Sequence, residues 1–120
     1  MEIQINTKSD YTLIRLLGKR IDTASTPDFR KNVCGKMPSF HKTIILDLTS
    51  ITFIDSSGLG ALVAAFKQLP MEGKLLLCGA GQNVMYLLKL TQLDSVFSLF
   101  PDVATAVQRV QKDTSLSSTH

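Results

Sequence analysis

Residues 43–60 read TIILDLTSITFIDSSGLG and carry the most informative pattern of the chain. Its first part, Thr43 to Leu48, is almost continuously apolar with Asp47 as its one charged residue, which is typical of a central strand buried on both faces. The polar cluster from Asp55 to Gly58 then introduces apolar residues spaced as on one face of a helix: Leu59, Leu62, Val63, Phe66 and Leu69. The stretch therefore predicts a buried strand, a turn and a helix, which Pro70 ends.

Towards the N-terminus the pattern predicts two strands and a helix. Residues 2–6 alternate apolar and polar side chains, and residues 11–17 are rich in β-forming residues. The short Lys8-Ser9-Asp10 connection between them favours an antiparallel hairpin. A helix then follows, capped by Thr26 and ended by Gly35.

Towards the C-terminus strands and helices alternate. Residues 74–78 and 96–100 predict strands, Asn83 is expected to cap the helix between them, and Pro101-Asp102 opens a last helix. This order predicts an α/β fold: a mixed, mostly parallel sheet of four to five strands after an N-terminal antiparallel hairpin, covered by about four helices. We expect one domain over residues 1–112 and a disordered polar tail over residues 113–120.

Composition excludes several classes of protein. With 120 residues, 44% hydrophobic and 19% charged, the chain is long enough for one domain with a core. No apolar run approaches the ~20 residues of a membrane span, and the N-terminus does not resemble a signal peptide, so we expect a cytoplasmic protein without membrane insertion. The net charge of +3 is spread along the chain rather than clustered, which argues against nucleic-acid binding.

The chain is poor in catalytic residues. Cys34 and Cys78 lack metal-ligand spacing and are expected to be small core residues, and His41 and His120 have no partner that would make a catalytic triad. Gly79-Ala80-Gly81 lacks the third glycine and the lysine of a phosphate-binding loop. We therefore expect no enzyme, no cofactor and no metal.

The cluster Asp55-Ser56-Ser57-Gly58 has two interpretations. Ser and Asp at a strand-to-helix turn commonly cap the helix, and Gly permits a tight backbone. A serine at a helix N-terminus is also a favourable phosphate acceptor, because the helix dipole stabilises added negative charge.

The expected outer face of this helix bears on that choice. Projection at ~100° per residue leaves small, nearly neutral residues opposite the apolar stripe: Ser57, Gly60, Ala61, Ala64 and Gln68. Such a face could let a partner protein approach closely. Alanine could equally be present only for its helix propensity.

These segments resemble the STAS domains, specifically the bacterial anti-sigma factor antagonists. The resemblance rests on Ile44 to Leu48 and Phe53 to Gly60, on Gly18 to Asp22 as the turn after the second strand, and on later elements across most of the chain. It implies that Ser57 is the phosphorylated residue, with Asp22, Asp55, Ser56 and Gly58 around it.

The resemblance also implies partners. The unmodified protein would bind an anti-sigma factor that is a serine kinase of the histidine-kinase-like ATPase fold, and so release sigma factor. Phosphorylation would end that binding, and a PP2C-type phosphatase would restore it. The alternative is a STAS adaptor or scaffold, in a lipid-transport ABC complex or a larger signalling assembly, without phosphate turnover. A nucleotide-binding module is the least supported reading, because no phosphate-cradling loop is present.

Overall fold

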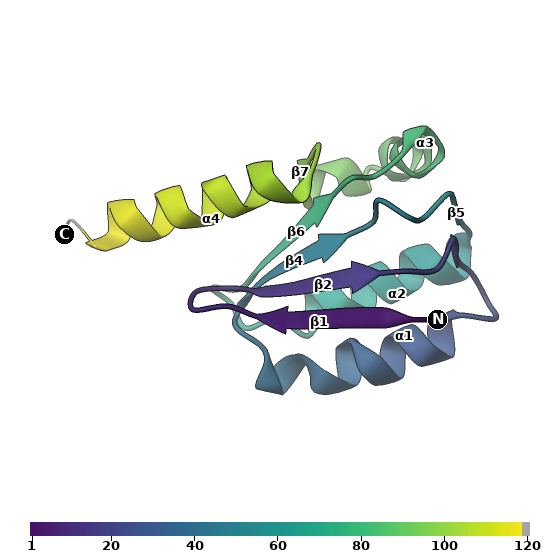
Figure 1. Ribbon diagram of the computed structural model, residues 1–120. Coiled ribbons are helices and arrows are strands. Elements are labelled where there is room, and N and C mark those ends of the chain that lie inside the picture. Colours follow the sequence, from purple (N-terminus) through teal and green to yellow (C-terminus); the bar gives the residue numbers. More distant parts are fainter. Residues whose placement is uncertain (119–120) are drawn as a thin grey trace.

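A five-stranded mixed sheet forms the centre of the molecule (Figure 1). The computed structural model describes residues 1–118, and the side chains of residues 1–113. The strands, in their spatial order, are β1 (Ile3–Thr7), β2 (Thr12–Leu16), β4 (Thr43–Asp47), β6 (Lys74–Cys78) and β7 (Ser98–Phe100). Strands β1 and β2 pair antiparallel and the others pair parallel, which confirms the predicted mixed sheet with an N-terminal hairpin.

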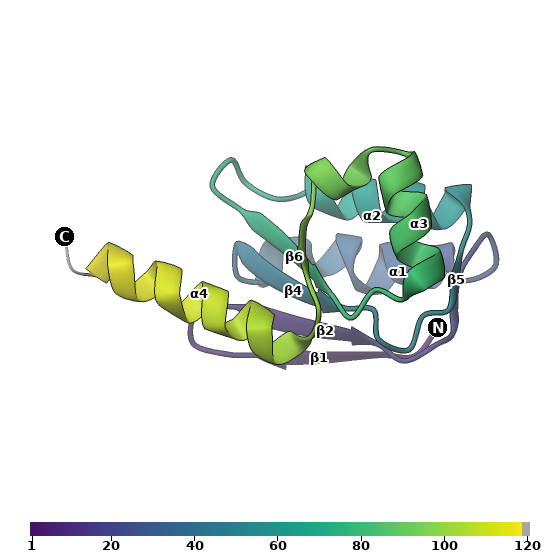
Figure 2. The same ribbon diagram turned by 90° about the horizontal axis from the view of Figure 1, so that it is seen from above.

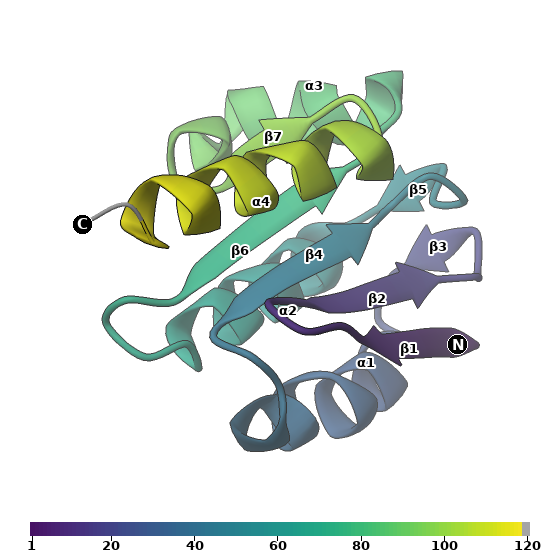
Figure 3. The same ribbon diagram turned by 60° about the vertical axis from the view of Figure 1, so that its left-hand side comes forward.

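Helices cover both faces of this sheet, with more of them on one face than on the other. They are α1 (Thr26–Asn32), α2 (Ser56–Lys67), α3 (Gln82–Leu90) and α4 (Val103–Ser118), with the short 3-10 helices η1 (Cys34–Ser39) and η2 (Leu93–Ser95). Figure 3 shows α4 in front of the sheet and α1 and α2 behind it.

The alternation of side chains along the strands produces two cores. Ile14, Leu46 and Leu77 pack on the side of α1, α2 and α3, together with Phe29 and other buried residues of those helices. The other face carries a smaller cluster that packs under α4. Its buried members are Tyr11, Leu13, Ile45, Leu76, Cys78, Ala106 and Val110.

The structure also contains a second, two-stranded sheet, which the sequence does not predict. Strand β3 (Arg20–Ile21) pairs parallel with β5 (Phe53–Ile54), and both lie just beyond the ends of β2 and β4 (Figure 3). Two-residue strands are too short to show a periodicity. Their pairing matters because it places the turn after β3 beside the start of α2.

Some predicted boundaries differ from the structure. Helix α1 ends at Asn32, and Gly35 lies inside η1. The N-cap of α1 is Ser25 and not Thr26, and the N-cap of α3 is Gly81 and not Asn83. Pro27 lies in the first turn of α1 with either cap, where its missing N–H costs nothing, so it does not fix the cap to one residue.

Helix α4 is longer than predicted. It continues through residues 113–118, where the sequence predicts a disordered tail, and it reaches beyond the strands (Figure 2). An ion pair of 3.3 Å between Lys74 Nζ and the Asp113 carboxylate ties this part of α4 to β6. Residues 119 and 120 lie outside the described residues. Within residues 1–118, no helix combines the length and apolar content that crossing a bilayer requires.

Candidate functional site

Ser57 is the second residue of α2 and does not cap it. The N-cap is Asp55, whose backbone is extended and whose Oδ1 accepts a hydrogen bond of 2.9 Å from Gly58 N. This carboxylate satisfies one of the free N–H groups of the first turn and also places negative charge at the positive end of the helix. The capping interpretation of the cluster therefore applies to Asp55, and both serine hydroxyls are free for other contacts.

The Ser57 hydroxyl lies at the surface beside Thr23. The two side-chain oxygens, Ser57 Oγ and Thr23 Oγ1, are 3.1 Å apart, and the contact is exposed to solvent. The backbone N–H of Thr23 donates to Asp55 Oδ2 over 3.3 Å. Thr23, which the sequence did not indicate, is therefore hydrogen-bonded both to the helix cap and to the neighbouring hydroxyl.

Gly58 allows β3 and α2 to approach each other. A Cβ atom at this position would lie 2.2 Å from the carbonyl oxygen of Ile21 and 2.6 Å from Cγ1 of Ile54. The same carbonyl accepts a hydrogen bond of 3.2 Å from Asp55 N. Glycine is required here by the close approach of the backbone, which confirms a structural role for this position in the cluster.

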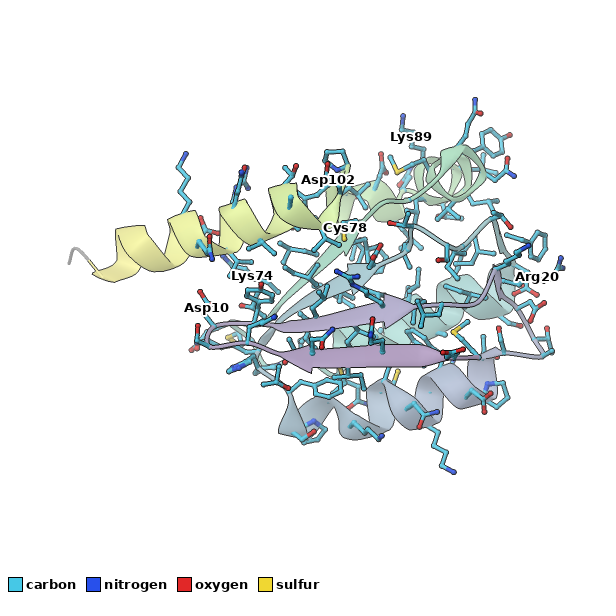
Figure 4. All side chains as sticks on the ribbon, viewed as in Figure 1. Asp10, Arg20, Lys74, Cys78, Lys89 and Asp102 are labelled. Atoms are coloured by element: carbon cyan, nitrogen blue, oxygen red, sulfur yellow. The ribbon has the colours of Figure 1, made fainter. Side chains whose placement is uncertain are left out.

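Asp22 holds the turn that carries Thr23. Its carboxylate accepts hydrogen bonds from Arg20 Nε at 2.9 Å and from Ser25 N at 3.1 Å. The Arg20 hydrogen bond, followed by those from Ser25, lowers the pKa of Asp22 below its ordinary value. Arg20 lies at the end of the sheet opposite Asp10 (Figure 4). The structure thus brings Asp22 into the turn next to Ser57, with its hydrogen bonds directed to Arg20 and Ser25.

The predicted orientation of α2 is wrong for several residues. Ala61, expected on the partner face, is 0% exposed, and Ala65 belongs to the same core. Phe66, expected in the core, is 37% exposed. Leu62 is buried as predicted, whereas Leu59, Val63 and Leu69 are only half-buried.

The reason for this rotation is that α2 packs against α1 as well as against the sheet. Arg30 of α1 lies beside Gly60 of α2, and Ala61 and Ala65 are buried in the core that α1 and α2 share. Of the residues expected on the partner face, Gly60 and Gln68 are exposed, and Ser57 and Ala64 are half-buried.

Two apolar side chains are exposed, one beside the Ser57 cluster and one near the C-terminal end of α2. Phe53, which precedes the Ser57 cluster, is 39% exposed. The Arg20 guanidinium lies over its ring, with 4.2 Å between Arg20 Cζ and the ring centroid. Phe66 packs edge-on against Phe97 with ring centroids 5.8 Å apart. The outward surface of α2 is therefore more apolar than the sequence projection suggested.

Cys78 and His41 each make a local structural contact away from Ser57. The Cys78 thiol lies between β6 and α4 (Figure 4), and burial, the largest cause, raises its pKa to about 12. The His41 ring is 2.6 Å from the carbonyl oxygen of Lys8, in the loop at the far end of the sheet. Among the described residues, no three His, Cys, Asp or Glu side chains are grouped as metal ligands would be.

A cavity of about 450 Å³ lies on the α4 side of the molecule. Residues of β6, β7 and α4 line it, among them Lys74, Phe100 and Arg109. None of its lining residues belongs to the cluster around Ser57, so the cavity and that cluster are separate features.

Comparisons with known proteins agree with this architecture. The model of the STAS domain family matches residues 2–106. An anti-sigma-B factor antagonist from Listeria monocytogenes is 34% identical over 103 residues, which are 82% of this chain and 90% of that protein.

Two solved structures share the fold. An anti-sigma factor antagonist from Mycobacterium paratuberculosis superimposes with a TM-score of 0.83 at 21% identity, over 92% of this chain and 93% of that one. The Bacillus cell fate determinant SpoIIAA in its phosphorylated form superimposes with a TM-score of 0.69 at 20% identity, over 91% and 99%.

Proposed function

The chain belongs to the STAS domain family, among its anti-sigma factor antagonists, and we propose that its switch is the side chain of Ser57. In the unmodified state the protein binds an anti-sigma factor that is also a serine kinase, and sigma factor is released. Phosphorylation of Ser57 ends this binding. A partner that controls sigma factor implies a cytoplasmic location.

The observation that carries the proposal is the position of the Ser57 hydroxyl. It is half-exposed, it lies in the first turn of α2, and Asp55 has taken the capping role. A phosphate here adds nearly two negative charges close to the positive end of the helix dipole, so the domain can stay folded. The same charge and bulk hinder the docking of a partner at this end of α2.

The covalent steps are those of a phosphoester. Ser57 Oγ attacks the γ-phosphorus of ATP, the bond from that phosphorus to the β-phosphate oxygen breaks, and ADP leaves. The hydroxyl proton passes to a base of the kinase. A PP2C-type phosphatase then hydrolyses the ester, which restores the Ser57 hydroxyl and releases inorganic phosphate.

We place the partner surface on the outward side of α2 rather than on the face that the sequence projection predicted. Gly60 and Gln68 remain part of it, whereas Ala61 cannot contact a partner because it is buried. The half-buried apolar residues Leu59 and Val63 add to this surface. A docking surface with apolar residues and few charges is typical of the centre of protein interfaces.

The name of the Listeria relative favours this function over a transporter adaptor. To test the proposal, the protein is incubated with ATP and the anti-sigma kinase that co-purifies with it, and the products are mapped by mass spectrometry. Ser56→Ala is the matched control for Ser57→Ala, because it removes the neighbouring hydroxyl of the same turn. We expect one phosphate on the wild type and on Ser56→Ala, and none on Ser57→Ala. Equal incorporation into Ser57→Ala would refute the assignment.

A further inference from the structure

The arrangement of α1 beside α2 suggests how a phosphate on Ser57 is held. We infer that the guanidinium of Arg30 binds the phosphoryl group within the same molecule, an inference that rests on the proposed function. Phosphorylation would thus create a new contact between α1 and α2 in addition to blocking the partner.

Arg30 is close enough to act in this way. Its Nη2 atom lies 3.8 Å from the position that a Cβ of Gly60 would occupy. Gly60 follows Ser57 by three residues, so the two positions are neighbours on the helix surface, with about 5 to 6 Å between Cβ atoms. The phosphorus atom lies one bond further out than Ser57 Oγ, within the range of a long and exposed arginine side chain.

Arg30 is also available. It is exposed, and within the residues whose side chains the structure describes it forms no ion pair. By contrast, Arg20, the cation of the neighbouring turn, is engaged by Asp22 at 2.9 Å. A guanidinium offers parallel N–H donors that match two phosphate oxygens, which makes arginine well suited to this contact.

The other groups around Ser57 allow this contact. The Asp55 carboxylate accepts from Gly58 N and Thr23 N, and the Asp22 carboxylate accepts from Arg20 and Ser25. Once Ser57 Oγ is an ester oxygen it has no proton, so the Thr23 hydroxyl can only donate, to that oxygen or to the phosphate. Thr23 and Arg30 therefore supply donors from two sides, and Arg30 supplies the positive charge that offsets the two carboxylates.

The test installs phosphoserine at position 57 during translation, so that no kinase is needed. The second ionisation of the phosphate, ordinarily near pH 6, is followed by ³¹P NMR. A cation in contact favours the dianion and lowers this pKa. We expect the titration midpoint of Arg30→Gln to lie about one pH unit above that of the wild type.

Lys31→Gln is the matched control, because it removes one exposed positive charge from the next position of the same helix. We expect its midpoint to stay within about 0.3 units of the wild type, since an exposed charge without contact is screened by solvent. Arg30→Lys keeps the positive charge but lacks the parallel N–H donors of the guanidinium, so it should give an intermediate midpoint. Circular dichroism checks that each variant is folded.

Two results would overturn the inference: equal midpoints in the wild type and Arg30→Gln, or equal shifts in Arg30→Gln and Lys31→Gln. The proposed function is tested separately, by the affinity of the phosphorylated wild type for the kinase. If the kinase binds the phosphorylated and the unmodified protein equally, the proposed function is refuted. The titration still reports whether Arg30 contacts the phosphate.

Discussion

At the scale of single residues, Gly58 and Gly60 of α2 look alike in sequence and differ in their surroundings. A side chain on Gly58 would collide with the Ile21 carbonyl oxygen and with Ile54, whereas a Cβ on Gly60 would meet only Arg30 Nη2 at 3.8 Å. One glycine is therefore needed for packing and the other is not.

Gly58→Ala and Gly60→Ala test this difference in one helix. We expect Gly58→Ala to lower the free energy of unfolding by about 2 to 3 kcal/mol, because backbone must move to admit the methyl group. Gly60→Ala should be neutral or stabilising by up to about 1 kcal/mol, because alanine is the better helix former. Urea unfolding followed by circular dichroism measures both. Similar losses in the two variants would contradict the close approach of β3 to α2.

Asp22 gives a prediction about pH. Its pKa is lowered in the folded protein, chiefly by the hydrogen bond from Arg20. The ionised carboxylate therefore stabilises the fold at pH values above its ordinary pKa of 3.8, and this contribution is lost as the pH falls through the lower folded value.

In Asp22→Asn this contribution is absent at every pH. We expect the wild type to be the more stable protein at about pH 6, and the difference between the two to shrink as the solution is acidified below the ordinary pKa. The urea concentrations at the unfolding midpoints of both proteins, measured at a series of pH values, give this difference in stability. A difference that stays constant down to about pH 2 would show that the Asp22 carboxylate has no such role.

Thr23 is a neighbour of Ser57 that the sequence does not reveal. Residues 55–58 were recognisable because they are consecutive and lie between a strand and a helix. Thr23 is 34 positions from Ser57 and reaches it only because β3 pairs with β5. No local pattern indicates a pairing of two-residue strands, so this neighbour could be found only in three dimensions.

At the scale of elements, α2 was predicted in the right place with the wrong rotation. Its residues 58–66 are all apolar or glycine, so a helical projection finds more than one plausible buried stripe. Packing against α1, β3 and β5 selects one of them, and in that orientation Ala61 and Ala65 are buried. The longer strands β4 and β6, in contrast, were predictable because continuous apolar runs mark strands covered on both faces.

Leu62→Ala and Phe66→Ala test this rotation. Leu62 is 0% exposed, so its truncation leaves a cavity and should cost about 2 to 5 kcal/mol. Phe66 is 37% exposed and contacts Phe97 at its edge, so its truncation should cost about 1 kcal/mol. Thermal and urea unfolding measure the two values. If Phe66→Ala is as costly as Leu62→Ala, the helix has the orientation that the sequence projection gave.

At the scale of the whole molecule, Ser57, the proposed switch, lies at the surface beside the turn that follows β3. Among the residues whose side chains the structure describes, its hydroxyl has one hydrogen-bond partner, Thr23 of that surface turn. The chain can therefore change the charge at this end of α2 without disturbing the packing on either face of the sheet. Binding and folding should respond independently to a negative charge at position 57.

Ser57→Asp makes this independence measurable. The carboxylate adds one negative charge in the first turn of α2, where the helix dipole stabilises it, so the free energy of unfolding should change by less than about 1 kcal/mol. Affinity for the kinase should fall at least about tenfold, because the charge lies at the proposed docking surface and must be desolvated there. Ser56→Asp is the matched control, because it places the same charge one residue earlier, at an exposed position. Calorimetric titration with the kinase and urea unfolding are carried out on the same preparations. If Ser57→Asp loses both binding and much of its stability, position 57 supports the fold. If Ser57→Asp binds the kinase as the wild type does while the phosphorylated protein does not, the second charge and the size of the phosphate are required.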